Sequence, residues 1–383
     1  MLLLPLLLLV LSGCGVSDTV SDFFRDDDNA EPPAELLDIK QRLKIFELWS
    51  RSTGGMGKHY LKLAPVVFNQ RLYIADSDGE LMALDATNGR EIWSIDTDVK
   101  ITGGPGYGEN TVLIGTSEAR TIAYSAEDGS EIWRKKVSSE ILSAPQKAEN
   151  TVVVRTGDGK IFGPSGNTGK RLWIYDRTVP SLTLRGTGTP VIDNGLVIAG
   201  FDGGKMAALE VKTGKLVWEA SVATARGRSE LERMVDIDSS PLVVDGVIYI
   251  ATFQGHLSAM QAETGRVLWD QDISSYAGFD ADDQNIYVTN EKSHIQAFDR
   301  FTSTELWEQD KLHLRAVTGP ASVGDYLVVG DFEGYLHWMS KTSGKFVARN
   351  RLCSDRIISQ PLVVGKVLYA FCSDGSLAAY SYR

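Results

Sequence analysis

The sequence has no excess of positive charge. Its 383 residues include 39 Lys and Arg against 50 Asp and Glu, which gives a formal net charge of -11 at pH 7. A chain with this balance repels the phosphates of nucleic acids and anionic lipid surfaces over most of its body. We therefore expect no nucleic-acid partner.

The sequence also lacks the short motifs of common catalytic sites. It contains no HExxH pair, no GxSxG elbow and no P-loop. The five histidines show no paired ligand spacing, and we expect each at the surface or in a turn: His59, His256, His294, His313 and His337. We expect neither catalytic residues nor a metal site.

Long hydrophobic runs are missing, except at the start. Residues 1–13 read MLLLPLLLLVLSG, too short for a bilayer-spanning helix of about 20 residues but typical of an export signal. Leu11-Ser12-Gly13-Cys14 resembles the bacterial lipobox, which implies that Cys14 is acylated and becomes the first mature residue. The alternative is a buried N-terminal strand with a chance cysteine. No Lys or Arg precedes the apolar run, which suggests a trimmed start or an incorrect start codon.

The segment after Cys14 differs in composition from both of its neighbours. Residues 14–40 contain Asp26-Asp27-Asp28 and Pro32-Pro33 with few apolar residues, which is typical of a flexible acidic linker. Gly15 stands where retention in the inner membrane usually needs Asp. We expect a signal peptide (1–13), an acylated linker (14–40) and a folded body (41–383) that faces the periplasm from the outer membrane.

The feature that dominates the remaining sequence is a repeat. A Gly-x-x-x-Trp tag recurs in five places, each with its tryptophan 28 residues after a proline: Trp93, Trp133, Trp173, Trp218 and Trp269. Residues 65–96 contain four short runs of β-branched and aromatic residues, separated by Asn69-Gln70, Asp78-Gly79 and Asn88-Gly89. Each repeat is therefore predicted to be a four-stranded antiparallel meander.

Eight such units can be counted. The sixth keeps Trp307 without the proline or the turn glycine, the seventh has Ala348 at the tryptophan position, and the eighth ends before a fourth strand. The run from Leu43 to Trp49 has the pattern of the missing strand. We predict an all-β fold, an eight-bladed β-propeller of four-stranded antiparallel blades, closed by an N-terminal strand that pairs with the last blade.

The tryptophans are expected to be structural. Each indole is a large apolar body that can wedge between neighbouring blades with its N–H satisfied locally, while the glycines serve the turns. The residues expected in this docking role are Trp49, Trp93, Trp133, Trp173, Trp218, Trp269 and Trp307.

The pattern from Ala83 to Trp93 resembles the repeat of pyrroloquinoline quinone (PQQ)-type propellers. That resemblance raises the alternative of a PQQ-dependent dehydrogenase, which would need adjacent cysteines and a group of oxygen ligands for Ca²⁺. Cys353 and Cys372 are not adjacent, and no such ligand group can be identified, so we expect no cofactor and no enzyme. A quinone absorbance band after addition of quinone and Ca²⁺ would indicate the alternative. The two cysteines could instead form a disulfide in an oxidising compartment or remain buried thiols.

Over essentially its whole length, the chain resembles the propeller lipoprotein of the outer-membrane β-barrel assembly machinery, the BamB family. The resemblance implies a non-catalytic scaffold that binds the POTRA domains of the barrel-assembly protein BamA and assists the folding and insertion of nascent outer-membrane proteins. The family's docking loops carry over to two connections between blades. The partner-binding residues are then Leu182, Leu184 and Arg185 after Trp173, and Asp236 and Asp238 after Trp218.

The spacing of the tryptophans points to the same connections. The interval of 40 residues stretches to 45 after Trp173 and to 51 after Trp218. Sequence beyond what the blades need is where binding residues usually lie, and leucines beside an arginine are typical of hot spots. The alternative is that both leucines tuck into the blade and Arg185 pairs with Asp236 or Asp238.

Two further hypotheses remain open. Client chains could add to exposed strand edges by β-augmentation, although no particular residues indicate this. A sugar- or peptidoglycan-binding propeller would need aromatic residues exposed together outside the docking positions, such as Tyr107, Tyr276 and Trp338.

Overall fold

The protein was analysed as a computed structural model. The structure describes residues 31–56, 61, 63–177, 188–223, 236–237, 239–253 and 255–383. These residues form 32 β-strands and no helix, so none of the described segments is an apolar helix of membrane-spanning length. Residues Ala34–Arg383 make one compact unit.

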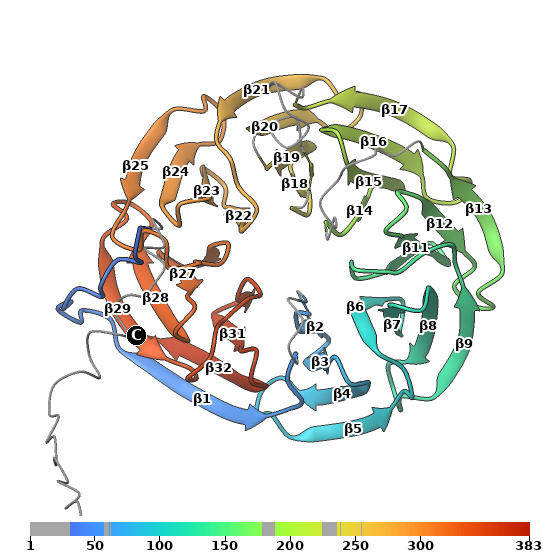
Figure 1. The fold of residues 1–383 in the computed structure, drawn as a ribbon, viewed down its shortest axis with the longest axis horizontal. Helices are drawn as coiled ribbons and strands as arrows, with labels where there is room; N and C mark the ends of the chain where they lie inside the picture. The colour runs from blue at the N-terminus through green and yellow to red at the C-terminus, as the bar shows by residue number, and fades with distance from the viewer. Residues whose placement is uncertain are drawn as a thin grey trace, which may run out of the picture. The chain divides into compact units, whose positions relative to one another are not determined.

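The strands form eight antiparallel sheets of four strands, arranged as blades around a central axis (Figure 1). In each blade the first strand lies nearest this axis and the fourth lies at the outside of the ring. Blade 1 has β2 (Val66–Phe68), β3 (Arg71–Ala75), β4 (Glu80–Asp85) and β5 (Glu91–Asp96), and blade 2 has β6 (Ile101–Gly108), β7 (Thr111–Thr116), β8 (Arg120–Ser125) and β9 (Glu131–Lys136). Blade 3 has β10 (Gln146–Ala148), β11 (Thr151–Arg155), β12 (Ile161–Pro164) and β13 (Arg171–Tyr175), and blade 4 has β14 (Val191–Asp193), β15 (Leu196–Phe201), β16 (Lys205–Glu210) and β17 (Leu216–Ser221).

The second half of the ring repeats this order. Blade 5 has β18 (Leu242–Val244), β19 (Val247–Ala251), β20 (His256–Gln261) and β21 (Val267–Asp272), and blade 6 has β22 (Gly278–Ala281), β23 (Asn285–Thr289), β24 (Ile295–Asp299) and β25 (Glu305–Gln309). Blade 7 has β26 (Ala321–Val323), β27 (Tyr326–Gly330), β28 (Tyr335–Ser340) and β29 (Phe346–Arg351). Blade 8 has β30 (Leu362–Val364), β31 (Val367–Phe371) and β32 (Ser376–Tyr382), and its outer strand is β1 (Ile45–Ser52).

The ring closes as the sequence predicts. The N-terminal β1 pairs antiparallel with the C-terminal β32, from Ile45 opposite Tyr382 to Ser52 opposite Ser376. The pairing covers the outer edge of β32, which would otherwise leave blade 8 one strand short. The prediction of an eight-bladed propeller closed by an N-terminal strand is confirmed.

The packed body begins earlier than the expected end of the linker at residue 40. The Ala34 N–H donates to His313 O at 2.9 Å, and the side chain of Leu36 packs against the core between blades 6 and 7. Residues 34–40 therefore belong to the folded unit. Most of the expected linker and the whole signal peptide, with Cys14, lie outside the described residues.

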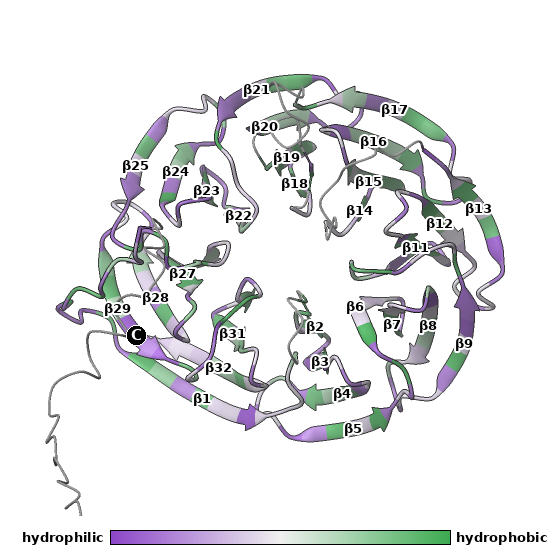
Figure 2. Cartoon of the chain, viewed as in Figure 1, coloured by the Kyte–Doolittle hydropathy of each residue, from purple (hydrophilic) through white to green (hydrophobic). Residues whose placement is uncertain are grey.

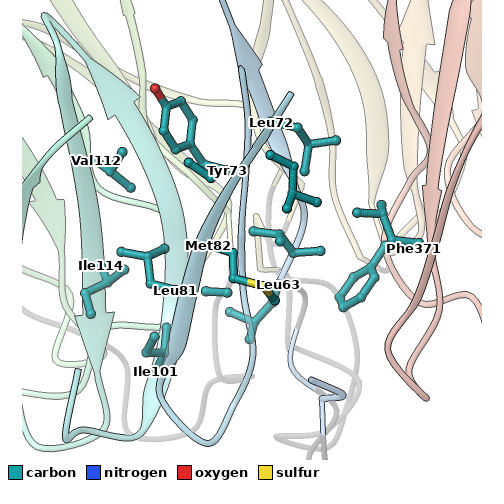
Figure 3. Close-up of a cluster of buried hydrophobic side chains, with 14 of the residues drawn as sticks. Leu63, Leu72, Tyr73, Leu81, Met82, Ile101, Val112, Ile114 and Phe371 are labelled. Atoms are coloured by element: carbon teal, nitrogen blue, oxygen red, sulfur yellow. The ribbon is translucent and has the colours of Figure 1, made fainter. Parts of the chain in front are cut away.

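The core follows from how the blades stack. The second and third strands of each blade are covered on both faces by neighbouring blades, so their apolar side chains form nearly continuous buried runs. Figure 3 shows such a cluster, in which Phe371 of blade 8 and Ile114 of blade 2 lie on either side of blade 1. The outer strands alternate between apolar and polar residues instead (Figure 2), because only one of their faces packs inward.

Seven tryptophans lie at the interfaces between neighbouring blades. Each of seven indoles donates its Nε1–H to a backbone carbonyl in the turn before the fourth strand of the next blade, at 2.7 to 3.3 Å. The pairs run from Trp49 with Ala86 O, through Trp173 with Val211 O, to Trp307 with Lys341 O. A buried aromatic N–H therefore has a partner at each of these seven interfaces.

Blade 7 reverses this arrangement. Its outer strand has Ala348 at the tryptophan position, and the residue opposite Ala348 in β28 is Trp338. Trp338 is fully buried, and its Nε1–H donates to Asn350 Oδ1 at 2.8 Å within the same blade. Trp338 is therefore a core residue, so the sugar-binding hypothesis cannot use it as part of an exposed aromatic set with Tyr107 and Tyr276.

Candidate partner-binding surface

The two long connections leave the ring on the same face, where the fourth strand of one blade leads to the first strand of the next. The first joins β13 to β14 and the second joins β17 to β18. Leu182, Leu184, Arg185 and Asp238 lie outside the described residues. Of the five expected partner-binding residues, the structure therefore places Asp236, together with the ends of both connections.

The C-terminal ends of the two connections lie side by side. A Cβ built on Gly188, at the end of the first, would lie 2.9 Å from Ser239 O and 3.2 Å from Ile237 O, at the end of the second. The next residue continues the contact, because the Thr189 N–H donates to Ser240 Oγ at 3.0 Å. A side chain at position 188 would separate the two segments, which explains why glycine stands there.

The two ends are held by neighbouring blades. Arg155, at the end of β11 in blade 3, donates to Gly188 O at 3.1 Å and to Asp202 Oδ1 at 3.4 Å. The Asp236 carboxylate accepts the N–H of Gly203 at 3.0 Å. The turn at residues 202–204 of blade 4 therefore holds the second connection directly and reaches the first through Arg155.

Asp236 is a buried residue. Only 2% of its surface is exposed, and its backbone carbonyl accepts the Phe253 N–H at 3.1 Å. The Asp236 carboxylate fixes this end of the second connection, because moving Asp236 would break its charge-assisted hydrogen bond to the Gly203 N–H. The adjacent Ile237 is also buried, and a Cβ on Gly200 would lie 2.2 Å from its Cγ2 atom.

The beginning of the first connection is held as well. The Arg177 guanidinium lies 3.4 Å from a carboxylate oxygen of Glu219 in β17 and 5.5 Å from the centre of the Phe201 ring. Tyr175 O–H donates to Glu219 at 3.4 Å, and burial together with this carboxylate raises the pKa of Tyr175. The beginning of the first connection therefore rests on blade 4.

The sequence reasoning missed these anchoring residues. The sequence does distinguish Arg155, because the neighbouring units have Gly115 and Gly200 at the position where the third unit has arginine. A lone buried arginine at a strand end needs acceptors, and the connection supplies them. Nothing in the sequence distinguishes Ile237 from other apolar residues.

The histidine expectation needs a correction. His337 in β28 is fully buried, and its Nε2 lies 2.9 Å from Asp331 Oδ2. Burial lowers the pKa of His337 although the Asp331 carboxylate acts in the opposite direction. Three others, His256, His294 and His313, are partly exposed, and His59 lies outside the described residues.

The described residues at the centre of the ring do not offer the ligands of a quinone and calcium site. A cavity of about 410 Å³ lies there, and among the described residues that line it Asp280 offers the sole carboxylate. Burial raises the pKa of Asp280 to about 6, and its oxygens accept the N–H groups of Ala281 and Ser322 at 2.9 and 2.7 Å. Calcium needs about six to eight oxygen ligands, so these lining residues do not fit it.

The cysteines are likewise unsuited to a metal. Cys353 and Cys372 form a disulfide, which resolves the two alternatives for this pair. Their sulfurs lie near a carboxylate oxygen of Asp374, but sulfurs bonded to each other are not thiolate ligands. The disulfide joins the connection after blade 7 to blade 8, beside the strand that closes the ring.

Taken together, the fold and the described residues define a tryptophan-docked β-propeller with two extended and anchored connections. The sequence model of the family described as "Outer membrane protein assembly factor BamB" matches residues 47–101, 77–309 and 292–383. The chain belongs to this family.

Individual relatives agree with this assignment. The outer membrane protein assembly factor BamB of Pseudomonas aeruginosa is 48% identical over 353 residues, which cover 92% of this chain and 93% of the relative. The crystal structure of BamB from Moraxella catarrhalis superimposes with a TM-score of 0.80 at 28% identity, over 88% of this chain and 100% of that chain. A quinohemoprotein alcohol dehydrogenase from Comamonas testosteroni has a TM-score of 0.68 at 14% identity over 88% of this chain and 76% of that chain, which shows a shared fold alone.

Proposed function

We propose that this protein is an assembly factor for outer-membrane proteins, acting as a non-catalytic scaffold. The observation that carries the proposal is the contact between the C-terminal ends of both long connections, which Arg155 and the turn at residues 202–204 hold in place. Two loops held at one place form a preorganised surface, and preorganisation reduces the entropic cost of binding a partner. Membership of the BamB family supports the same role.

The proposed partner is the barrel-assembly protein BamA, bound through its POTRA domains. Leu182, Leu184 and Arg185 would make the direct contacts, since apolar side chains beside an arginine are common hot spots. Asp236 would act indirectly by holding the base of the second connection, which follows from its burial. Asp238 remains a proposed direct contact.

A binding titration with purified POTRA domains tests this surface. The double variant Leu184→Ala and Arg185→Ala should bind at least about 30-fold more weakly, because loss of a single hot spot costs about 2 kcal/mol or more. Leu306→Ala is the matched control, because Leu306 is 50% exposed but lies on the outer strand of blade 6. Undiminished binding by the double variant would remove this site from the proposal.

We further propose that Cys14 is acylated and anchors the body to the outer membrane, facing the periplasm. The lipobox-like sequence before Cys14 supports the anchor. More than one acyl chain gives stable attachment. Mass spectrometry of the N-terminal peptide purified from membranes would detect the acyl groups, and an unmodified Cys14 would contradict the anchor.

Nascent outer-membrane proteins are the proposed clients. The outer strands of blades 3, 4 and 5 each carry two exposed apolar side chains beside an open strand edge: Leu172, Ile174, Leu216, Val217, Val267 and Leu268. An extended client segment could pair with such an edge through backbone hydrogen bonds. Fluorescence titration with unfolded porin-derived peptides should show binding, and no detectable affinity would leave the scaffold role alone.

A further inference from the structure

An N-terminal strap, defined as residues 34–43, lies against blades 6 and 7 (Figure 1). Its first residue, Ala34, donates to His313 O, and the N–H groups of Arg42 and Leu43 both point to Val347 O, at 2.7 and 3.2 Å. The Leu43 side chain is buried in the core of blades 7 and 8. The strap therefore joins the closing strand β1 to the segment that precedes the folded body.

Two arginines hold the carbonyl groups of the strap. Arg315 Nη1 donates to Ala34 O at 3.0 Å, and Arg349 Nη1 donates to Leu37 O at 2.9 Å. Both arginines also belong to a buried cluster of charged and polar side chains between β28, β29 and the turn after β27. The position of the strap is therefore coupled to that cluster.

The hydrogen bonds determine the state of His337 at the centre of this cluster. Arg349 Nε lies 3.1 Å from His337 Nδ1, and a guanidinium has no acceptor, so Nδ1 must accept the hydrogen bond. His337 Nε2 must then carry the hydrogen and donate it to Asp331 Oδ2 at 2.9 Å. His337 is therefore a neutral imidazole while Arg349 is in place.

We propose that the strap is a pH-sensitive clasp, which is released when His337 takes up a proton at Nδ1. The added N–H would face the N–H of Arg349, and two donors repel each other. Arg349 would move away and withdraw its hydrogen bond from Leu37 O. The strap would then lose one of its two guanidinium contacts.

The groups around His337 favour its neutral form at neutral pH. The titratable and charged groups that face this cluster are Asp331 and Glu333 from the turn after β27, Arg315 from the connection before β26, Tyr335 on β28, Arg349 on β29 and Asp38 of the strap. Burial lowers the pKa of His337, and the positive charges of Arg349 and Arg315 act in the same direction. Burial alone would raise the pKa of Asp331, but its hydrogen bonds, led by the one from His337, hold it below its ordinary value.

The sign of the pH effect follows from linkage. A histidine whose pKa is lowered in the closed state binds its proton more readily in the open state, so acid favours opening. If opening restores the ordinary pKa of 6.5, the opening equilibrium at pH 5.5 exceeds its value at pH 7.5 by at most about tenfold. Release of ten residues would lengthen the free segment by up to about 35 Å.

Hydrogen–deuterium exchange of the full chain tests the clasp. After correction for intrinsic exchange rates, protection of the strap amides should fall between pH 7.5 and pH 5.5, by up to about tenfold. The amides of Ala34, Arg42 and Leu43 report directly, because they donate to blades 6 and 7. Amides in the β1 to β32 pairing should keep their protection, since they do not depend on Arg349. Equal protection of the strap at both pH values would overturn the proposal.

Two variants separate His337 from other titrating groups. In His337→Gln the amide can donate to Asp331 and accept from Arg349 without becoming charged, so strap protection should no longer depend on pH. His256→Gln is the matched control, because His256 lies in blade 5, and it should behave as the wild type. Arg349→Met should give low protection at both pH values, and it serves as the test if His337→Gln fails to fold. An unchanged pH dependence in His337→Gln, or unchanged protection in Arg349→Met, would contradict the clasp.

Discussion

At the scale of single residues, the glycine and the tryptophan of each tag belong to two different contacts. The glycine of one blade receives the indole of the preceding blade, as Gly265 receives Trp218, while Trp269 of the same tag docks onto blade 6. Gly265 also has φ of +69°, so it meets two separate requirements. Each tag therefore contributes to two interfaces, one with the preceding blade and one with the next.

Gly265→Ala separates these two requirements when it is compared with Gly246→Ala. Both glycines lie in blade 5 with positive φ, but a Cβ on Gly265 would lie 2.5 Å from Trp218 Cε3, whereas a Cβ on Gly246 has nothing within 4 Å. The left-handed backbone should cost each variant roughly 1 kcal/mol in the free energy of unfolding. Overpacking against the indole should cost Gly265→Ala about 1 to 3 kcal/mol more.

Urea unfolding of both variants and the wild type gives the comparison. Equal losses in the free energy of unfolding of the two variants would show that overpacking against the Trp218 indole does not destabilise Gly265→Ala.

At the scale of the blade, ring closure explains why blade 7 lacks the docking tryptophan. Seven indoles dock onto the turn that precedes the fourth strand of the next blade. Blade 8 has no such turn, because its fourth strand is β1 from the other end of the chain. An indole on β29 would find no acceptor there, and Trp338 on β28 uses Asn350 instead.

We predict that moving the indole from position 338 to position 348 does not restore stability. Trp338→Ala should lower the free energy of unfolding by about 3 to 5 kcal/mol, because it removes a fully buried aromatic side chain. Adding Ala348→Trp returns the indole to the position used in the other blades, but it should not restore stability, since the turn carbonyl is absent. Denaturant unfolding of the single and double variants measures the effect, and full recovery in the double variant would contradict the explanation.

The same elements show what a sequence can and cannot predict. The strand order, closure and seven docked indoles followed from repeated local signals, because each blade must satisfy the same packing rule. His337 was misplaced because β28 is buried on both faces, and polar residues there depend on partners from other elements. The strap was taken for linker because its contacts are backbone hydrogen bonds and two guanidinium groups far along the chain.

The candidate site shows the same limit. The stretched intervals indicated which connections to propose as the partner surface, and family resemblance supplied the proposed residues. Neither could show that Asp236 is buried or that Arg155 anchors the neighbouring connection, because both depend on the turn at residues 202–204. Sequence spacing located the loops, whereas their anchoring depends on tertiary contacts.

At the scale of the whole molecule, the ring has two specialised regions. The described ends of the two long connections lie at blades 3 to 5, whereas β1 and the disulfide lie at blades 7 and 8 and the strap lies against blades 6 and 7. A partner bound at the first region would leave the closing seam free. We therefore expect strap variants such as Arg349→Met to retain partner binding.

The central claim is that this propeller is a scaffold whose long connections bind the barrel-assembly protein. Its most direct test is purification of the protein from membranes at its native level, with mass spectrometry of what accompanies it. The barrel-assembly protein should be the main partner of the wild type and of Leu306→Ala, and it should be largely lost from the Leu184→Ala and Arg185→Ala double variant. Absence of that protein from the wild-type sample, or its full retention by the double variant, would contradict the account.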